Sequence, residues 1–183
     1  REFIHWRTTV DIKNIRVLLE KENISIITCN DATFPRLLTE LPDPPAALFV
    51  RGTIPTHGET IAIVGTRKTT TYGKQVTTSF AQELAARGCI LVSGLALGTD
   101  SFVLEAAVQA ATPTIAVLGS GVDSRSIYPR ANANLAERII ASGGAIVSEY
   151  PPGFSPTPYS FPARNRIIAG LCRTVLVTEA PEN

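Results

Sequence analysis

Five short apolar runs recur at regular spacing from residue 61 onward, and they constrain the fold more than any other feature of the sequence. They occupy residues 61–64, 89–92, 114–118, 145–147 and 174–177. Three amphipathic segments, 74–87, 99–111 and 132–142, lie between them. Buried strands that alternate with helices at this spacing are typical of a parallel sheet covered by helices on both faces. The sequence therefore predicts an α/β fold with a doubly wound, mostly parallel, Rossmann-like sheet.

The residues before this region show a different pattern. Residues 11–22 place Ile12, Ile15, Leu18 and Leu19 on one face of a predicted helix, and residues 25–29 and 47–50 are predicted strands. A short helix is predicted at 33–41, and Pro42, Pro44 and Pro45 then form a stiff linker. We therefore divide the chain into a small α-rich N-terminal appendage with its linker, 1–45, and a Rossmann-like domain, 46–183. Because no covering element follows the fifth run, we expect this domain to be incomplete at its C-terminus.

Composition limits the classes of protein to consider. The 183 residues are 44% hydrophobic, and the formal net charge is +1, so a contact with nucleic acid requires a local basic patch. No apolar run approaches the ~20 residues that cross a bilayer. The three cysteines have no CxxC spacing, and Cys89 and Cys172 lie in apolar runs, which favours buried free thiols and a cytoplasmic protein. The two histidines give no metal-ligand spacing, and we expect neither a metal nor a cofactor.

The turn after the first run combines a glycine, a hydroxyl and two cations: Gly65, Thr66, Arg67 and Lys68. Backbone amides here, the Thr66 hydroxyl and a helix N-terminus near Tyr72 would together suit a phosphate. An ordinary tight turn with solvent-exposed cations explains the same residues about equally well. The turn is thus a candidate anion site whose ligand the turn alone does not identify.

The turn after the second run is glycine-rich, but it lacks the GxGxxG spacing of a dinucleotide fingerprint. Asp100 is interpreted as a cap of the following helix in preference to a catalytic acid. Ser93 is conceivable as a nucleophile, yet neither His5 nor His57 lies in the regular region to serve as its base.

Residues 161–170 gather Phe161, Arg164, Asn165 and Arg166 near the start of a predicted helix. An aromatic ring, guanidinium groups and an amide suit nucleic acid, because they can stack a base and bind backbone phosphate. The alternative is a core aromatic residue beside a solvated basic face.

Taken in order, these segments resemble the DNA-processing protein A (Smf) family. The matching residues are Phe34–Leu38, Leu41–Pro45 and Leu48–Gly52, then Ile63–Arg67 with Tyr72-Gly73, Val92–Ala96 with Gly98–Asp100, Ile115–Leu118 with Gly121 and Tyr128-Pro129, Ser148–Gly153, Phe161-Pro162 with Arg164–Leu171, and Glu179-Ala180. The resemblance is specific because so many short motifs follow one another at the family's spacing.

The resemblance implies a binding protein rather than an enzyme. It implies a protein of natural transformation that binds and protects single-stranded DNA, helps load the RecA recombinase and forms a homodimer at full length. Carried over residue by residue, it implies that Gly65, Thr66 and Arg67 hold a DNA phosphate, with Arg164, Asn165, Arg166 and Phe161 in the same pocket. Lys68, Ser93 and Gly94 complete the candidate DNA-binding set. The alternative is a Rossmann-like nucleotide or phosphoribosyl hydrolase that uses Asp100, Glu149 or Glu179 for acid–base chemistry.

Overall fold

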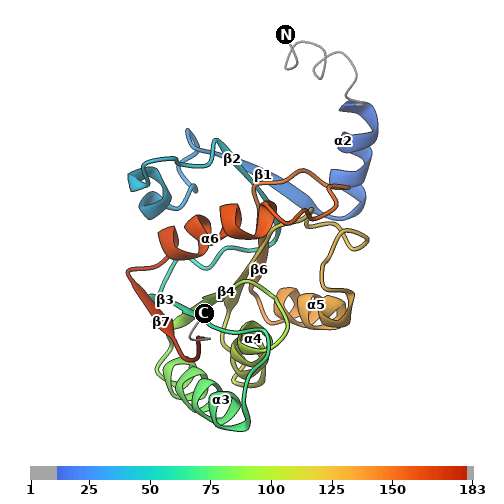
Figure 1. The fold of residues 1–183 in the computed structure, drawn as a ribbon. Helices are drawn as coiled ribbons and strands as arrows, with labels where there is room; N and C mark the ends of the chain where they lie inside the picture. Colours follow the sequence, from blue (N-terminus) through green and yellow to red (C-terminus); the bar gives the residue numbers. More distant parts are fainter. Residues whose placement is uncertain (1–11, 181–183) are drawn as a thin grey trace.

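The chain forms one seven-stranded mixed sheet with helices on both faces (Figure 1). The computed structural model describes residues 12–180. The elements, in chain order, are α2 (Ile12–Lys21), β1 (Ile24–Thr28), the 3₁₀ helix η1 (Arg36–Glu40), β2 (Ala47–Gly52), β3 (Thr60–Val64), α3 (Thr71–Ala86), β4 (Ile90–Ser93), α4 (Thr99–Gln109), β5 (Thr114–Leu118), the 3₁₀ helix η2 (Arg130–Asn132), α5 (Ala133–Ala141), β6 (Ala145–Ser148), α6 (Ser160–Gly170) and β7 (Thr174–Val177).

The predicted α/β class is confirmed. The strands lie in the order β1-β2-β6-β5-β4-β3-β7, and the five strands from β6 to β7 are parallel. The predicted runs at 114–118 and 174–177 coincide with β5 and β7. The runs at 61–64 and 145–147 are one residue shorter than β3 and β6, and the run at 89–92 is shifted by one residue from β4. Apolar runs locate the central strands well because both faces of a central parallel sheet are buried, whereas β7 is a largely exposed edge strand.

The sheet extends across the predicted boundary between residues 45 and 46. β1 precedes this boundary and pairs antiparallel with β2, with Ile27 opposite Leu48. β2 in turn pairs antiparallel with β6. The strand of the predicted appendage is therefore an edge strand of the same sheet as the Rossmann-like core. The predicted helix at 33–41 is shorter than expected, because η1 follows Pro35 and ends just before Pro42.

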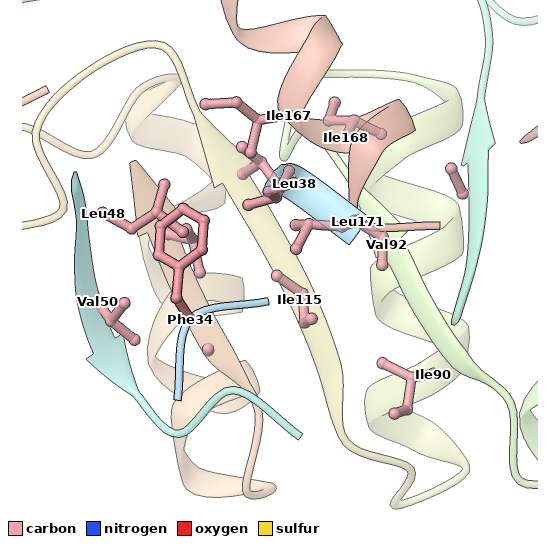
Figure 2. Close-up of a cluster of buried hydrophobic side chains, with 14 residues drawn as sticks. Phe34, Leu38, Leu48, Val50, Ile90, Val92, Ile115, Ile167, Ile168 and Leu171 are labelled. Atoms are coloured by element: carbon pink, nitrogen blue, oxygen red, sulfur yellow. The ribbon is translucent and has the colours of Figure 1, made fainter. Parts of the chain in front are cut away.

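Two layers of helices enclose the sheet. One face packs against η1 and α6, where Leu38, Ile167, Ile168 and Leu171 meet Val92 and Ile115 of the strands (Figure 2). The other face packs against α3, α4 and α5 through side chains such as Ala81, Val103 and Ile139. Among the described residues, no helix combines the length and apolar character that a membrane crossing requires.

The cysteines are less buried than the sequence predicts. Cys89 and Cys172 are only partly buried, Cys29 is exposed, and all three are free thiols. Burial still raises the pKa of the Cys172 thiol to about 12. This thiol therefore stays protonated at neutral pH and is a poor nucleophile.

The connection between β6 and β7 creates a topological switch point. From β3 to β6 the chain moves steadily in one direction across the sheet, and its helices α3, α4 and α5 lie on one face. After β6 the chain returns through α6, on the opposite face, and places β7 on the far side of β3 (Figure 1). In open α/β sheets the ligand crevice lies at such a point, outside the carboxyl ends of the strands. The fold therefore points to the exits of β3 and β7.

Candidate nucleic-acid interface

Two adjoining hollows occupy this edge of the sheet. The first, which we call the switch-point hollow, has a volume of about 470 Å³ and is lined by the Gly65–Arg67 turn, Asp100, α6 and Glu179. The second, the aromatic hollow, measures about 560 Å³ and includes Tyr128 and Phe161. Arg67, Arg164 and Asn165 line both. The structure thus brings the two predicted basic segments, 65–68 and 164–166, to one place.

Arg67 is the cation most open to a ligand in these hollows. It is exposed, and its guanidinium carbon lies 5.1 Å from the centroid of the Phe161 ring. No described carboxylate lies within ion-pair distance of it. A guanidinium over an aromatic face is attracted electrostatically and held in position without losing its charge. Arg67 is therefore oriented and free to bind an anion.

Tyr128 lies at the site although it is not part of the candidate DNA-binding set predicted from the sequence. Its ring lies 5.8 Å from that of Phe161 at a tilt of 44°, and it is 50% exposed. The sequence shows this tyrosine before a proline but gives no sign that the loop containing it folds against α6. Two aromatic rings beside an exposed arginine form a surface on which bases can stack.

The helix N-terminus that we expected to hold a phosphate is filled by a carboxylate of the chain itself. The Glu179 carboxylate accepts hydrogen bonds from the Thr70 backbone N–H, at 3.1 Å and 3.3 Å to its two oxygens, and its backbone oxygen accepts from Thr66 N–H at 2.8 Å. An internal anion at a helix N-terminus satisfies free amides and complements the helix dipole. The Thr66 and Thr70 amides are thus already paired with acceptors of the chain itself. What the turn offers outward is the Arg67 and Lys68 side chains and the Thr66 hydroxyl, which accepts from Lys68 N–H and keeps its own proton to donate.

The close approach of Glu179 depends on Gly73, which leads to a testable prediction. A Cβ at position 73 would lie 1.8 Å from Oε2 of Glu179. Gly73→Ala is therefore expected to displace the flexible Glu179 carboxylate from the Thr70 N–H. Losing this hydrogen bond costs about 0.5–1.5 kcal/mol, while alanine favours the helix by about 1 kcal/mol, so the free energy of unfolding is expected to change by less than about 1 kcal/mol. Urea unfolding monitored by circular dichroism measures this.

The matched control is the double variant Gly73→Ala/Glu179→Ala, which removes the carboxylate that collides. If the clash is the cause, Glu179→Ala lowers the free energy of unfolding clearly less in the Gly73→Ala protein than in the unmodified protein. An equal decrease in the free energy of unfolding in the Gly73→Ala and unmodified proteins would contradict the clash.

Packing within the chain leaves no room for a side chain at Gly65, which also lines the switch-point hollow. A Cβ there would lie 2.6 Å from Oγ1 of Thr99 and 2.8 Å from the backbone oxygen of Glu179. The turns after β3 and β4 and the end of β7 therefore meet at this residue. The glycine that suggested close approach of a phosphate allows close approach of the chain to itself.

Arg164 is a buried structural residue. Its side chain is inside the protein, and Nη1 donates to the backbone oxygens of Gly94, at 2.6 Å, and Val117. Burial lowers the pKa of its guanidinium, and the negative charge of Asp100 opposes that shift. Arg164 thus connects the exits of β4 and β5 to α6 and contributes positive charge from beneath the hollows.

The turn after β4 is held from below by Asp100. This carboxylate, itself 7% exposed, accepts hydrogen bonds from the backbone N–H groups of Gly94 and Ala96. Burial raises the pKa of Asp100, and the charge of Arg164 opposes that shift. Asp100 therefore holds the loop before α4 rather than capping its own helix. Ser93 is fully buried and donates to the Ile63 backbone oxygen. Gly94 lines a small pocket of about 70 Å³ beside the two hollows, together with Arg67 and Phe161.

The remaining predicted residues separate into two groups. Lys68 and Asn165 are exposed, and Asn165 lines both hollows. Arg166 lies apart from them, because its Nη2 pairs with Glu149 at 2.7 Å and its Nε lies 3.4 Å from Asp43. Arg164, Asn165 and Arg166 are adjacent in the sequence, but α6 directs their side chains to different surroundings.

The three acids considered for a hydrolase are all bound by protein donors. Asp100 accepts from backbone amides, Glu149 from Arg166, and Glu179 from Thr70. The described residues also contain no group of three His, Cys, Asp or Glu side chains placed to hold a metal ion. No specific observation therefore favours hydrolysis at this edge.

The fold and the site define a class: an open α/β protein with an arginine and an aromatic surface at its switch-point crevice. The sequence matches the family model for DNA recombination-mediator protein A over residues 25–183. It is 45% identical over 168 residues to protein Smf of Synechocystis, covering 88% of this chain and 41% of that protein. The chain belongs to the DNA recombination-mediator protein A family.

Solved structures agree with this assignment. DNA processing protein A from Streptococcus pneumoniae superposes with a TM-score of 0.81 at 35% identity, over 99% of this chain and 62% of that one. The Helicobacter pylori protein, whose structure concerns its single-stranded DNA binding mode, gives a TM-score of 0.75 at 35% identity, over 87% of this chain and 71% of that one. The present chain spans less than half the length of protein Smf from Synechocystis and from Escherichia coli.

Proposed function

We propose that this part of the chain binds single-stranded DNA at the switch-point and aromatic hollows. Arg67 binds a backbone phosphate, and Phe161 and Tyr128 offer ring faces to the bases. The observation that supports this most is the exposed Arg67 guanidinium beside two aromatic rings. Positive charge next to stacking surfaces is the usual arrangement for single-stranded nucleic acid.

The other candidate residues contribute to DNA binding either by direct contact or by supporting the site. Thr66 offers a hydroxyl donor, and Lys68 and Asn165 offer exposed polar groups at the rim. Arg164 acts through its charge and by holding the strand exits together. Because few groups are placed to read base edges, binding is expected to tolerate any sequence.

At the level of the whole protein, we propose a recombination mediator that protects incoming single-stranded DNA and helps load the RecA recombinase, without catalysis of its own. Homodimerisation is part of this proposal. Family membership and the single-stranded DNA binding of the Helicobacter pylori relative support it.

A salt titration tests the DNA proposal. Affinity for oligo-dT is expected to fall linearly with salt on a logarithmic plot, with a slope of about −0.7 for each phosphate bound. Fluorescence anisotropy measures this, with mixed-sequence single strands and duplex DNA beside oligo-dT. Binding that is insensitive to salt, or stabilisation by a mononucleotide with release of free base, would favour the hydrolase instead.

A further inference from the structure

A third hollow lies on the same side of the molecule, between the N-terminal helix α2 and the loop before η2. It measures about 600 Å³, and its wall includes Lys21, Glu22, Arg125 and Tyr128. Tyr128 and Pro156 also line the aromatic hollow. The two hollows therefore adjoin at Tyr128. We call the third one the α2 hollow.

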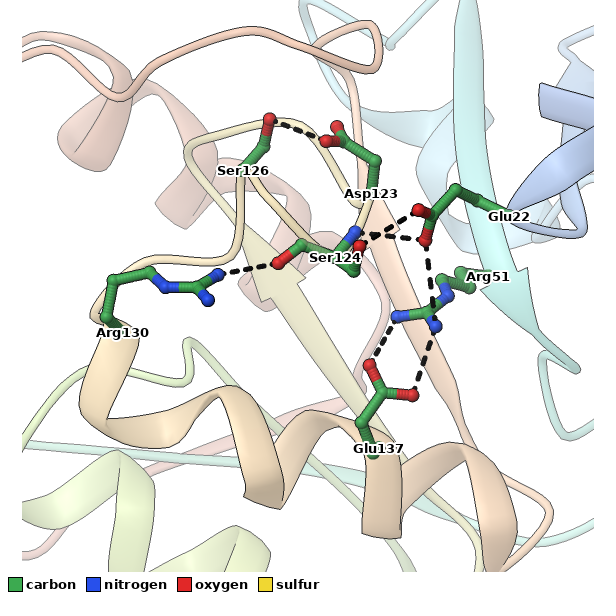
Figure 3. Close-up of polar contacts among 7 residues, drawn as sticks. All are labelled: Glu22, Arg51, Asp123, Ser124, Ser126, Arg130 and Glu137. Carbon is green, nitrogen blue, oxygen red and sulfur yellow. Dashed lines mark hydrogen bonds and ion pairs between the residues drawn. The ribbon is translucent and has the colours of Figure 1, made fainter. Parts of the chain in front are cut away.

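The acidic groups in this wall are occupied by donors from the protein. Glu22 accepts from the Ser124 backbone N–H at 3.1 Å and from its hydroxyl at 2.9 Å (Figure 3). Asp123 accepts from Gly153 N–H at 2.7 Å and from the Ser126 hydroxyl at 3.0 Å. Two of the roughly four acceptor sites of each carboxylate are thus used within the fold, and Arg51, at 3.8 Å, offsets part of the charge of Glu22.

The cations of the wall are directed to solvent. Lys21 and Arg125 are exposed, and neither forms an ion pair with another described residue. Arg130 instead supports the loop, because its Nη1 donates to the Ser124 backbone oxygen (Figure 3). The hollow therefore presents two cations without ion-pair partners among the described residues, Lys21 and Arg125, beside carboxylates that accept hydrogen bonds from the protein.

The α2 side of the hollow is fixed to the sheet. Glu22 follows α2 directly, and besides its bonds to Ser124 it lies 3.8 Å from Arg51 of β2. Arg51 is held in turn by Glu137 of α5 through two hydrogen bonds, at 2.7 Å and 3.0 Å (Figure 3). A cation on a fixed helix end loses less freedom on binding than one on a mobile arm.

We infer that a DNA strand bound at Arg67 continues past Tyr128 into the α2 hollow, where Lys21 and Arg125 contact backbone phosphates. This extension rests on the proposed function at Arg67. The exposed Tyr128 ring lies where the two hollows join and provides a stacking surface there. Lys21 and Arg125 add sequence-independent affinity that only a strand long enough to reach them can use.

A length series tests the inference. Binding of oligo-dT of about 5 and about 15 nucleotides, lengths within the usual range of single-stranded sites, is compared for the unmodified chain and for Lys21→Ala/Arg125→Ala. The double variant is expected to bind the longer oligomer about 5- to 20-fold more weakly, and its salt slope is expected to be shallower by about 1.4, since each of the two phosphates contributes about 0.7. The decrease for the shorter oligomer is expected to stay below about 2-fold, because that strand ends at the Arg67 site.

The matched control is Lys13→Ala/Arg173→Ala, which also removes two exposed cations that form no ion pair with a described residue. Lys13 lies earlier on α2, and Arg173 precedes β7 at the opposite edge of the sheet. This control is expected to leave both affinities unchanged. An equal decrease for both oligomer lengths, or a similar decrease in the control, would overturn the extended path.

The outcomes separate this inference from the function on which it rests. If Arg67→Ala weakens the binding of both oligomers but Lys21→Ala/Arg125→Ala weakens neither, the extended path is overturned and the Arg67 site is not. Failure of the unmodified chain to bind either oligomer at low salt would overturn the proposed function itself.

Discussion

Replacing Arg164 by alanine is expected to lower the free energy of unfolding by about 2–4 kcal/mol, because buried backbone oxygens lose a charged hydrogen-bond donor and the space filled by the side chain is left empty. The side chain is 5% exposed, and its Nη1 donates to backbone oxygens at the ends of two neighbouring strands. Its removal leaves the Gly94 and Val117 oxygens without that donor, and the buried Asp100 carboxylate loses a nearby positive charge that lowers its pKa. Urea unfolding measures the decrease in stability.

Two comparison variants define the cause. Arg87→Ala removes an exposed arginine that pairs with Glu83 on the surface of α3, and its effect is expected to stay within about 0.5 kcal/mol. Asp100→Asn in the Arg164→Ala background removes the uncompensated negative charge and is expected to recover part of the stability. An Arg164→Ala protein as stable as Arg87→Ala would show that the buried arginine does not support the fold.

Replacing Arg67 by alanine is expected to weaken single-stranded DNA binding about 10- to 100-fold at low salt, while the stability changes by less than about 0.5 kcal/mol. The side chain is exposed, and its described contacts are with Phe161 and the hollows, so the fold does not depend on it. Because one phosphate is no longer bound, the salt slope is also expected to become shallower by about 0.7. Anisotropy titrations across a salt series, beside urea unfolding of the same variant, provide both numbers.

Arg67→Lys is the conservative comparison. Lysine keeps the charge but lacks the planar fork and the stacking of the guanidinium on Phe161, so affinity is expected to fall between the native and alanine values. Arg87→Ala again serves as the control for a general change in charge. If Arg67→Ala bound oligo-dT as tightly as Arg87→Ala at every salt concentration, the site would not be at the strand exits.

The contrast between Arg67 and Arg164 shows how far the sequence could predict the site. Both appear in the sequence as arginines in short polar motifs, and both are predicted to line one DNA-binding pocket. Only the packing of α6 against the β4 and β5 exits shows that one is buried and the other exposed. The strands were easier to predict, because an apolar run is a local property, whereas the burial of an arginine depends on chain segments far away in the sequence.

Long-range contacts explain the other differences. The carboxylate at the α3 N-terminus belongs to Glu179. It accepts a hydrogen bond from the Thr70 amide, which lies 109 positions earlier in the sequence. No motif around Thr70 indicates this partner. β1 likewise precedes the proline-rich segment that suggested a linker, and only its pairing with β2 shows that it belongs to the sheet.

The bond between Glu179 and the Thr70 amide also sets an order of events during synthesis. The ribosome produces the Gly65–Thr70 turn long before it produces β7, because chains emerge from the N-terminal end. Until Glu179 has emerged and β7 has paired with β3, the turn lacks the two acceptors that hold its Thr66 and Thr70 amides. A nascent chain therefore gains these two acceptors of the Arg67 turn only after β3, β4, β5 and β6 have been synthesised.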